Sequence, residues 1–180
     1  MTMLGRFTPE ARRTIVRAGR LAAEAGRPAL GDAFLLLALA EARPVGASAG
    51  DLRREVGAPE GRDRALLAVL GIDADEVRRR AREATATRPD DPALWTLRRS
   101  PLRPLRVTLS GPGAAMVLDG SGRKAVEVAL WTCRRSRRAR AGHDDLLRGL
   151  LADGAGEAVG VLRRLGVDVG ELWAGSRGAA

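Results

Sequence analysis

The sequence contains an internal repeat. Phe7-Thr8 aligns with Leu118-Asp119 at an offset of 111 residues, and the apolar residues that follow keep the same spacing in both copies. The other aligned pairs are Ala11 with Gly122, Ile15 with Val126, Ala18 with Ala129, Ala22 with Cys133, Gly31 with Gly142, Leu35-Leu36 with Leu146-Leu147 and Leu39 with Leu150. Apolar residues three and four apart share one face of an α-helix. The repeat therefore predicts two equivalent helical units.

Each copy contains signals for four helices. In copy one, Thr8 and Pro9 favour a helix start, Gly26 favours its end, and Asp32 is the expected cap of a second, buried helix. The third is expected over residues 63–70 and the fourth from Asp73. In copy two the helices are expected over residues 119–136, 144–152, 155–165 and 168–174.

The two copies differ in length. Leu70-Gly71-Ile72-Asp73 matches Leu165-Gly166-Val167-Asp168 at a smaller offset than the rest of the repeat, so copy one carries extra residues between Glu41 and Arg64. Residues 43–50 are rich in small residues and contain a proline, which is typical of a loop. We expect the extra residues to lengthen this loop.

The segment between the copies is rich in proline. Its prolines are Pro89, Pro92, Pro101, Pro104 and Pro112. Proline interrupts helices, so we expect a linker that packs along the surface, with residues 106–109 as a short extended piece.

These patterns predict one all-α globule of two pseudo-symmetric four-helix repeats. We expect the first repeat at residues 1–87, the linker at 88–117, the second repeat at 118–175 and a frayed tail at 176–180. Residues 7–40 and 118–151 should superpose about a pseudo-twofold axis. A sheet of three or more strands would contradict this architecture.

Composition excludes several classes of protein. With 180 residues, 45% of them hydrophobic, the chain can bury a core. Its single Cys133 excludes an intrachain disulfide, and its single His143 excludes the common zinc sites. The amino-terminal residues show no signal-peptide pattern and no apolar run is long enough to span a membrane, so we expect a cytoplasmic protein.

The chain is strongly basic, with a net charge of +9, and only Lys124 among its basic residues is a lysine. The surplus is spread evenly over both copies and the linker. The densest run, residues 134–140, is interpreted as a solvated helix end. Nucleic-acid binding by a basic helical protein stays open as the alternative function.

The candidate chemical motifs are weak. His143-Asp144-Asp145 fits a helix start better than a catalytic base, and Gly120-Ser121-Gly122 fits a helix start better than a phosphate loop. Trp131 lies beside the apolar stripe of its helix, where partial exposure would make it a candidate interface anchor. We expect no enzyme activity, catalytic residue, metal or cofactor.

The repeat motifs resemble a known family. Phe7-Thr8, Gly31 with the following leucines, and Leu70-Gly71-Ile72-Asp73, together with their second-copy equivalents, resemble the amino-terminal Clp repeat domain of ClpC-type unfoldases. That domain binds substrates, adaptor proteins, arginine-phosphorylated proteins and, in some bacteria, cyclic peptide antibiotics. This sequence lacks the AAA+ modules of an unfoldase. The resemblance therefore implies a free-standing binding module that acts as an adaptor, competitor or decoy in Clp-dependent proteolysis.

The resemblance also implies the site residues. The expected ligand-binding residues are Phe7, Thr8, Asp32, Leu118, Asp119 and Asp144, near a groove where the repeats meet. The family's glutamate, which contacts the guanidinium of phosphoarginine, is replaced by Ala33 in copy one and by Asp144 in copy two. Asp119 would repel a phosphate. We therefore expect weak phosphoarginine binding, and a peptide, protein or cyclic peptide as ligand. A Clp ATPase or its substrates are the expected partners.

Overall fold

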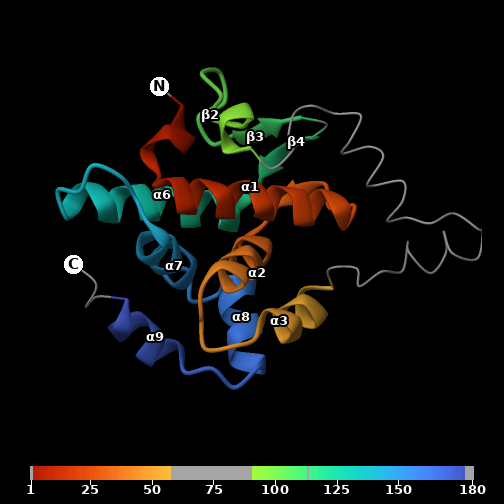
Figure 1. Ribbon diagram of the computed structural model, residues 1–180, viewed down its shortest axis with the longest axis vertical. Helices are drawn as coiled ribbons and strands as arrows, with labels where there is room; N and C mark the ends of the chain where they lie inside the picture. The colour runs from red at the N-terminus through yellow and green to blue at the C-terminus, as the bar shows by residue number, and fades with distance from the viewer. Residues whose placement is uncertain (1, 58–90, 113, 177–180) are drawn as a thin grey trace, which may run out of the picture.

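The computed structural model describes residues 2–57, 91–112 and 114–176 and arranges them in three layers (Figure 1). Helices α1 and α6 form the middle layer, with a sheet on one side and α2, α7 and α8 on the other. The elements in chain order are η1 (Met3–Arg6), α1 (Pro9–Glu24), β1 (Ala29–Leu30), α2 (Asp32–Ala42), α3 (Ala49–Val56), η2 (Pro92–Leu94), β2 (Thr96–Arg99), β3 (Val107–Gly111), β4 (Ala114–Leu118), α6 (Gly120–Arg135), α7 (His143–Leu151), α8 (Glu157–Arg164) and α9 (Val169–Gly175).

Several helix starts follow the predicted capping. The Thr8 hydroxyl accepts a hydrogen bond from the amide of Ala11 (3.3 Å). The α7 start is closed by Asp145, which accepts from the amide of Gly142 (2.9 Å), so the capping interpretation of His143-Asp144-Asp145 is confirmed. The prediction that Asp32 caps α2 is wrong, because Gly31 occupies the cap position and Asp32 is the first helical residue.

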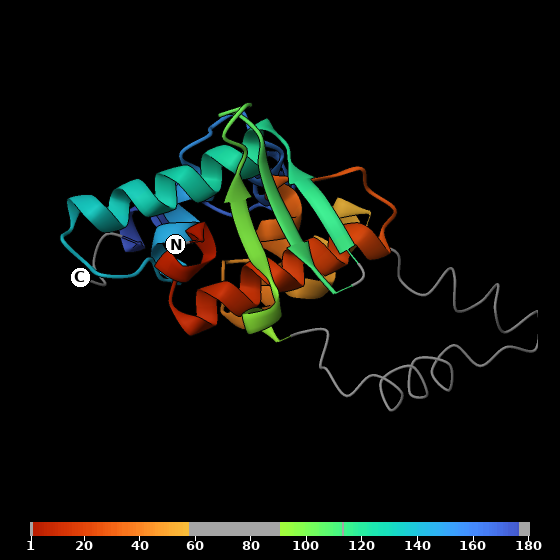
Figure 2. The ribbon, with the colours of Figure 1, turned by 90° about the horizontal axis from the view of Figure 1, so that it is seen from above.

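The all-α prediction is wrong in one respect, because the described part of the linker forms strands. The sheet order is β1-β4-β3-β2, with β4, β3 and β2 antiparallel and β1 parallel to β4. Figure 2 shows its strands crossing over α1 and α6. Alternate residues are buried toward these helices, namely Leu97, Val107, Leu109, Met116 and Leu118. Pro89 lies outside the described residues; the other four prolines of this segment lie in η2 and in the connections between strands, where no ladder hydrogen bond is lost.

A second difference lies in the extra residues of copy one. Part of the expected loop is helix α3, which begins after Ser48, whose hydroxyl accepts from the amide of Asp51 (3.1 Å). It ends at Gly57, whose positive φ of 65° suits glycine. The helices expected over residues 63–70 and from Asp73 lie outside the described residues.

Matched contacts join the two copies at the predicted offset. The amide of Thr8 donates to the carbonyl of Ala141 (2.9 Å), and the amide of Asp119 donates to the carbonyl of Leu30 (3.1 Å). The preceding residues also form parallel β-pairs. Phe7 forms an isolated β-bridge with Ala141, and Leu118 of β4 pairs with Leu30 of β1. Superposition of the two halves stays a prediction.

Asp32 joins the beginnings of three helices. Its side chain is 1% exposed and belongs to the first residue of α2. One carboxylate oxygen accepts from the hydroxyl of Ser121 in α6 (3.1 Å), and the other accepts from the amide of Ala158 in α8 (3.2 Å). Burial raises the pKa of Asp32, since the charged form loses its water. This carboxyl therefore fixes α2 against α6 and α8.

Close packing of the helices depends on small residues as well as leucines. The side chains of α2 are buried along most of its length, including Leu35, Leu36 and Leu37. A Cβ at Gly149 of α7 would clash with the carbonyl oxygen of Ala125, so glycine allows α6 and α7 to approach. Within the described ranges, no helix has the length and apolarity needed to cross a membrane.

The matched leucines Leu36 and Leu147 are 0% and 1% exposed. Truncation of a buried leucine to alanine costs about 2–5 kcal/mol. We expect Leu36→Ala and Leu147→Ala each to lower the melting temperature by about 5–15 °C, measured by calorimetry. Leu102→Ala is the control, because Leu102 is 92% exposed. Equal melting of all three variants would show that these helices do not form the core.

The raised pKa of Asp32 gives a stability effect of defined sign. Folded protein holds this proton more tightly than the unfolded chain, so the contribution of Asp32 is largest below the ordinary Asp pKa of about 3.9 and declines as pH rises above it. Asp32→Asn removes the titration and keeps an acceptor for Ala158. We expect the melting temperature of wild type, relative to Asp32→Asn, to fall as the pH rises above the ordinary Asp pKa of about 3.9.

Asp51→Asn is the matched control for this titration. Hydrogen bonds from Ser48 and Arg54 lower the pKa of Asp51, so its stabilising contribution is present above the ordinary pKa and is lost on acidification. The difference between wild type and Asp51→Asn should therefore change with pH in the opposite direction. The same direction for both variants would contradict the assignment of Asp32.

Candidate functional site

The first of two polar junctions lies where α1 and α7 begin. The hydroxyl of Thr14 lies 2.9 Å from Nε2 of His143, and Asp144 forms an ion pair with Arg43. Burial lowers the pKa of His143, so this ring is neutral at pH 7. Asp144 is the residue that aligns with the family's glutamate. Its carboxylate is therefore already paired with the guanidinium of Arg43 of the same chain.

The second junction lies where α6 and α2 begin. Asp119 is exposed and accepts from the amide of Gly122 (2.7 Å) and the hydroxyl of Ser121 (2.8 Å), so it caps α6. The predicted helix start at Gly120-Ser121-Gly122 is therefore confirmed. Asp119 still presents a negative charge at the surface.

The six predicted site residues divide between these junctions. Phe7, Thr8 and Asp144 belong to elements that meet at the first, and Asp32, Leu118 and Asp119 to elements that meet at the second. Phe7, Asp32 and Leu118 are 0%, 1% and 3% exposed. The side chains of these three residues are enclosed and pack in the core, and their contact with a ligand stays a prediction. Thr8 and Asp144 are half-buried and Asp119 is exposed.

A depression with a volume of about 490 Å³ lies between η1 and α6. Most of the residues that line it were not predicted from the sequence. The depression lies between the beginning of copy one and the first helix of copy two, and none of the six expected site residues lines it. Its lining consists of Met3, Arg6, Arg99, Glu127, Val128, Leu130, Trp131 and Arg134. The sequence points to two of these residues, Trp131 from its place beside the apolar stripe and Arg134 from the basic run at residues 134–140.

The depression combines an apolar wall with charged sides. Trp131 is 57% exposed, and the guanidinium of Arg135 lies 5.2 Å from the centre of its ring. Arg99 pairs with Glu127 across the depression, and Arg123 reaches the same carboxylate (3.3 Å). An exposed aromatic ring beside Met3 and Leu130 can bury an apolar side chain, while the charged residues can hold a peptide backbone or its ends.

The remaining candidate residues have structural surroundings. Cys133 is buried, its thiol donates to the carbonyl of Arg138 (3.2 Å), and burial raises its pKa. Arg138 makes two hydrogen bonds to the fully buried carboxylate of Asp145. Part of the basic run at residues 134–140 therefore secures the start of α7. Among the described residues, no group of three or more His, Cys, Asp or Glu could hold a metal ion.

Comparison with solved structures identifies the fold. The amino-terminal domain of ClpD, a caseinolytic-protease-associated chaperone of Arabidopsis thaliana, matches with a TM-score of 0.60 and 19% identity, over 97% of this chain and 94% of that chain. The Hsp104 amino-terminal domain of Candida albicans matches with a TM-score of 0.51 and 14% identity, over 97% and 93%. A structure from a malarial protein secretion system matches with a TM-score of 0.54 and 14% identity, over 96% and 93%.

Sequence comparisons add no closer relative, since no family model and no curated protein matches the chain. The structural neighbours cover 96–97% of the chain. The predicted resemblance is confirmed at the level of structure: this chain has the fold of the amino-terminal domains of Clp and Hsp104 chaperones.

Proposed function

We propose that this chain is a non-enzymatic binding module that captures an apolar peptide segment in the depression between η1 and α6. The observation that carries the proposal is the exposed ring of Trp131 in that depression, within a fold shared with chaperone amino-terminal domains. Trp is enriched among the residues that anchor protein interfaces, because its ring offers a large apolar surface together with a polar N–H.

The role that fits this site is recognition without unfolding. A module that binds the same segments as a Clp ATPase would act as an adaptor when it delivers them and as a competitor or decoy when it retains them. Peptides, unfolded proteins and cyclic peptides with apolar side chains are its proposed ligands. A Clp ATPase or its substrates are its proposed partners.

Phosphoarginine is a poor ligand under this proposal. Asp144 is paired with Arg43, so an incoming guanidinium must displace an internal one. At the second junction, Ala33 supplies no acid, and the exposed Asp119 repels a phosphate. Recognition of an unmodified apolar segment meets none of these obstacles.

The function is tested by replacing Trp131. The probe is a fluorescein-labelled peptide with two Phe and two Leu residues in a Gly-Ser background, measured by fluorescence anisotropy. An aromatic side chain that becomes buried contributes about 1.5–3 kcal/mol. We therefore expect Trp131→Ala to weaken binding by about tenfold or more with an unchanged melting temperature.

Leu94→Ala is the matched control for this experiment, because Leu94 is 38% exposed and does not line the depression. Its affinity should equal that of wild type. A salt titration with duplex DNA tests the alternative function, since binding driven by phosphate contacts falls steeply with salt. Unchanged peptide binding by Trp131→Ala, or DNA binding with such a salt dependence, would contradict the proposal.

The pairing of Arg43 with Asp144 gives a second test, by calorimetry with free phosphoarginine. Removal of Arg43 frees the carboxylate, and a partly exposed ion pair is worth up to about 1 kcal/mol. We expect Arg43→Ala to bind phosphoarginine up to about fivefold more tightly than wild type, and the gain to disappear in Arg43→Ala/Asp144→Ala. Tight binding by wild type that survives Asp144→Ala would contradict this interpretation of the site.

A further inference from the structure

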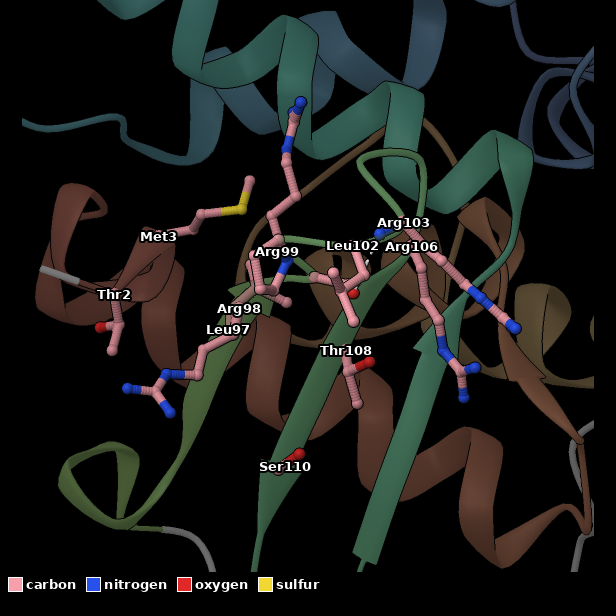
Figure 3. Close-up of a pocket in the computed structure, with 12 residues that line it drawn as sticks. Thr2, Met3, Leu97, Arg98, Arg99, Leu102, Arg103, Arg106, Thr108 and Ser110 are labelled. Atoms are coloured by element: carbon pink, nitrogen blue, oxygen red, sulfur yellow. Dashed lines mark hydrogen bonds between the residues drawn. The ribbon is translucent and has the colours of Figure 1, made fainter.

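A larger depression lies on the outer face of the sheet, away from α1 and α6 (Figure 3). Its volume is about 830 Å³, and β2, β3 and the loop between them supply most of its lining. The hydroxyls of Thr108 and Ser110 lie along β3, and the side chains of Arg98, Arg103 and Arg106 extend around them. No part of the proposed function uses this surface, which we call the arginine face and define by these five residues.

The arginine face carries positive charge without compensation. Arg98, Arg103 and Arg106 are exposed, and none of them pairs with a carboxylate of the part of the chain that the structure describes. The lining itself contains no Asp or Glu. By contrast, Arg99 at the border of the depression is paired with Glu127. The unpaired positive charge therefore lies on the arginine face, next to the Arg99–Glu127 ion pair.

Hydrogen bonds hold the loop that presents these arginines. The amide of Ser100 donates to the carbonyl of Arg106 (2.8 Å), and the amide of Arg106 donates to the carbonyl of Arg103 (2.8 Å). The hydroxyl of Ser100 also accepts from the amide of Arg103 (3.2 Å). A closed turn keeps Arg103 and Arg106 on the same side of the sheet as Arg98, so little backbone order has to be gained when a ligand binds.

The arginine face is continuous with the peptide depression. Met3 and Arg99 line both. A single extended segment can therefore pass from Trp131, over Arg99, onto the outer face of the sheet. Along this path the surface changes from mainly apolar to mainly basic, although the exposed Leu102 also lies in the lining of the larger depression.

We propose that the arginine face selects peptides in which acidic residues adjoin the apolar segment bound at Trp131. Guanidinium groups bind carboxylates through charge-assisted hydrogen bonds, and the hydroxyls of Thr108 and Ser110 can donate to the same oxygens. Single-stranded nucleic acid fits less well, because the lining of this depression contains no aromatic side chain on which a base could stack. The inference rests on the proposed function, since the apolar segment supplies the anchor.

The experiment compares three labelled peptides: the neutral Phe/Leu peptide, the same peptide followed by four Glu residues, and the four Glu residues in a Gly-Ser background alone. Wild type should bind the acidic Phe/Leu peptide about tenfold more tightly than the neutral one, and this preference should shrink as salt is raised from 50 to 300 mM. Arg103→Ala/Arg106→Ala should abolish the preference and leave the affinity for the neutral peptide unchanged.

Arg140→Ala/Arg163→Ala is the charge-matched control, because both arginines are exposed and neither lines a depression described here. It should keep the preference for the acidic peptide.

Equal affinity of wild type for the acidic and neutral peptides, or loss of the preference in the control, would overturn the inference and leave the proposed function intact. Failure of the neutral peptide to bind would count against the proposed function. Stronger binding of a poly-dT oligonucleotide than of the acidic Phe/Leu peptide, lost in Arg103→Ala/Arg106→Ala, would overturn the inference in favour of nucleic acid.

Discussion

The buried carboxyl of Asp32 is the interaction on which the arrangement of helices depends. Two of the three helices that meet there, α2 and α8, have glycine at the cap position, Gly31 and Gly156, so the cap offers no side chain to the unpaired amides of the first turn. Asp32 accepts from the amide of Ala158 and from Ser121, and it lies where the positive ends of these helices converge. The Asp32 carboxyl thus accepts a hydrogen bond from a backbone amide at the start of α8 that has no side-chain cap of its own. Its burial has a cost, visible in the raised pKa, which the hydrogen bonds offset in part.

Helices α1, α2, α6, α7, α8 and α9 could be predicted from the sequence because their causes are local, whereas α3 replaced part of an expected loop. The start of α1 depends on Thr8 and Ala11, three residues apart, and the apolar stripe repeats within each turn. The contacts of Asp32 are different, since they join residues separated by 89 and 126 positions. A single sequence contains no sign of which distant amide a carboxyl will reach. For that reason Asp32 was expected to be a cap or a ligand-binding residue instead of a buried junction.

The sheet escaped prediction because its strands are short and the segment is rich in proline. Only β3 was anticipated, as a short extended piece over residues 106–109; in β2, Arg99 stands where the alternation calls for an apolar residue, and prolines lie on both sides. What makes these residues a sheet is the neighbouring layer of helices. Leu109 packs so near Gly19 of α1 that a Cβ there would lie 2.5 Å from it. Tertiary burial of one face therefore decided the conformation, as is usual for strands of low intrinsic preference.

The arginines show why composition could not locate the binding surface. Many of them serve the fold: Arg17 pairs with Glu41, Arg164 with Glu55, and Arg138 with the buried Asp145. Those on the outer face of the sheet have no such partner among the described residues, and a net charge cannot distinguish the two groups. An apolar depression alone supplies affinity with little discrimination, because most unfolded segments contain a large apolar side chain. Charge beside it adds discrimination and faster encounter. Under the two proposals, the adjoining depressions divide recognition between them: the first buries apolar surface, and the second selects the charge next to it.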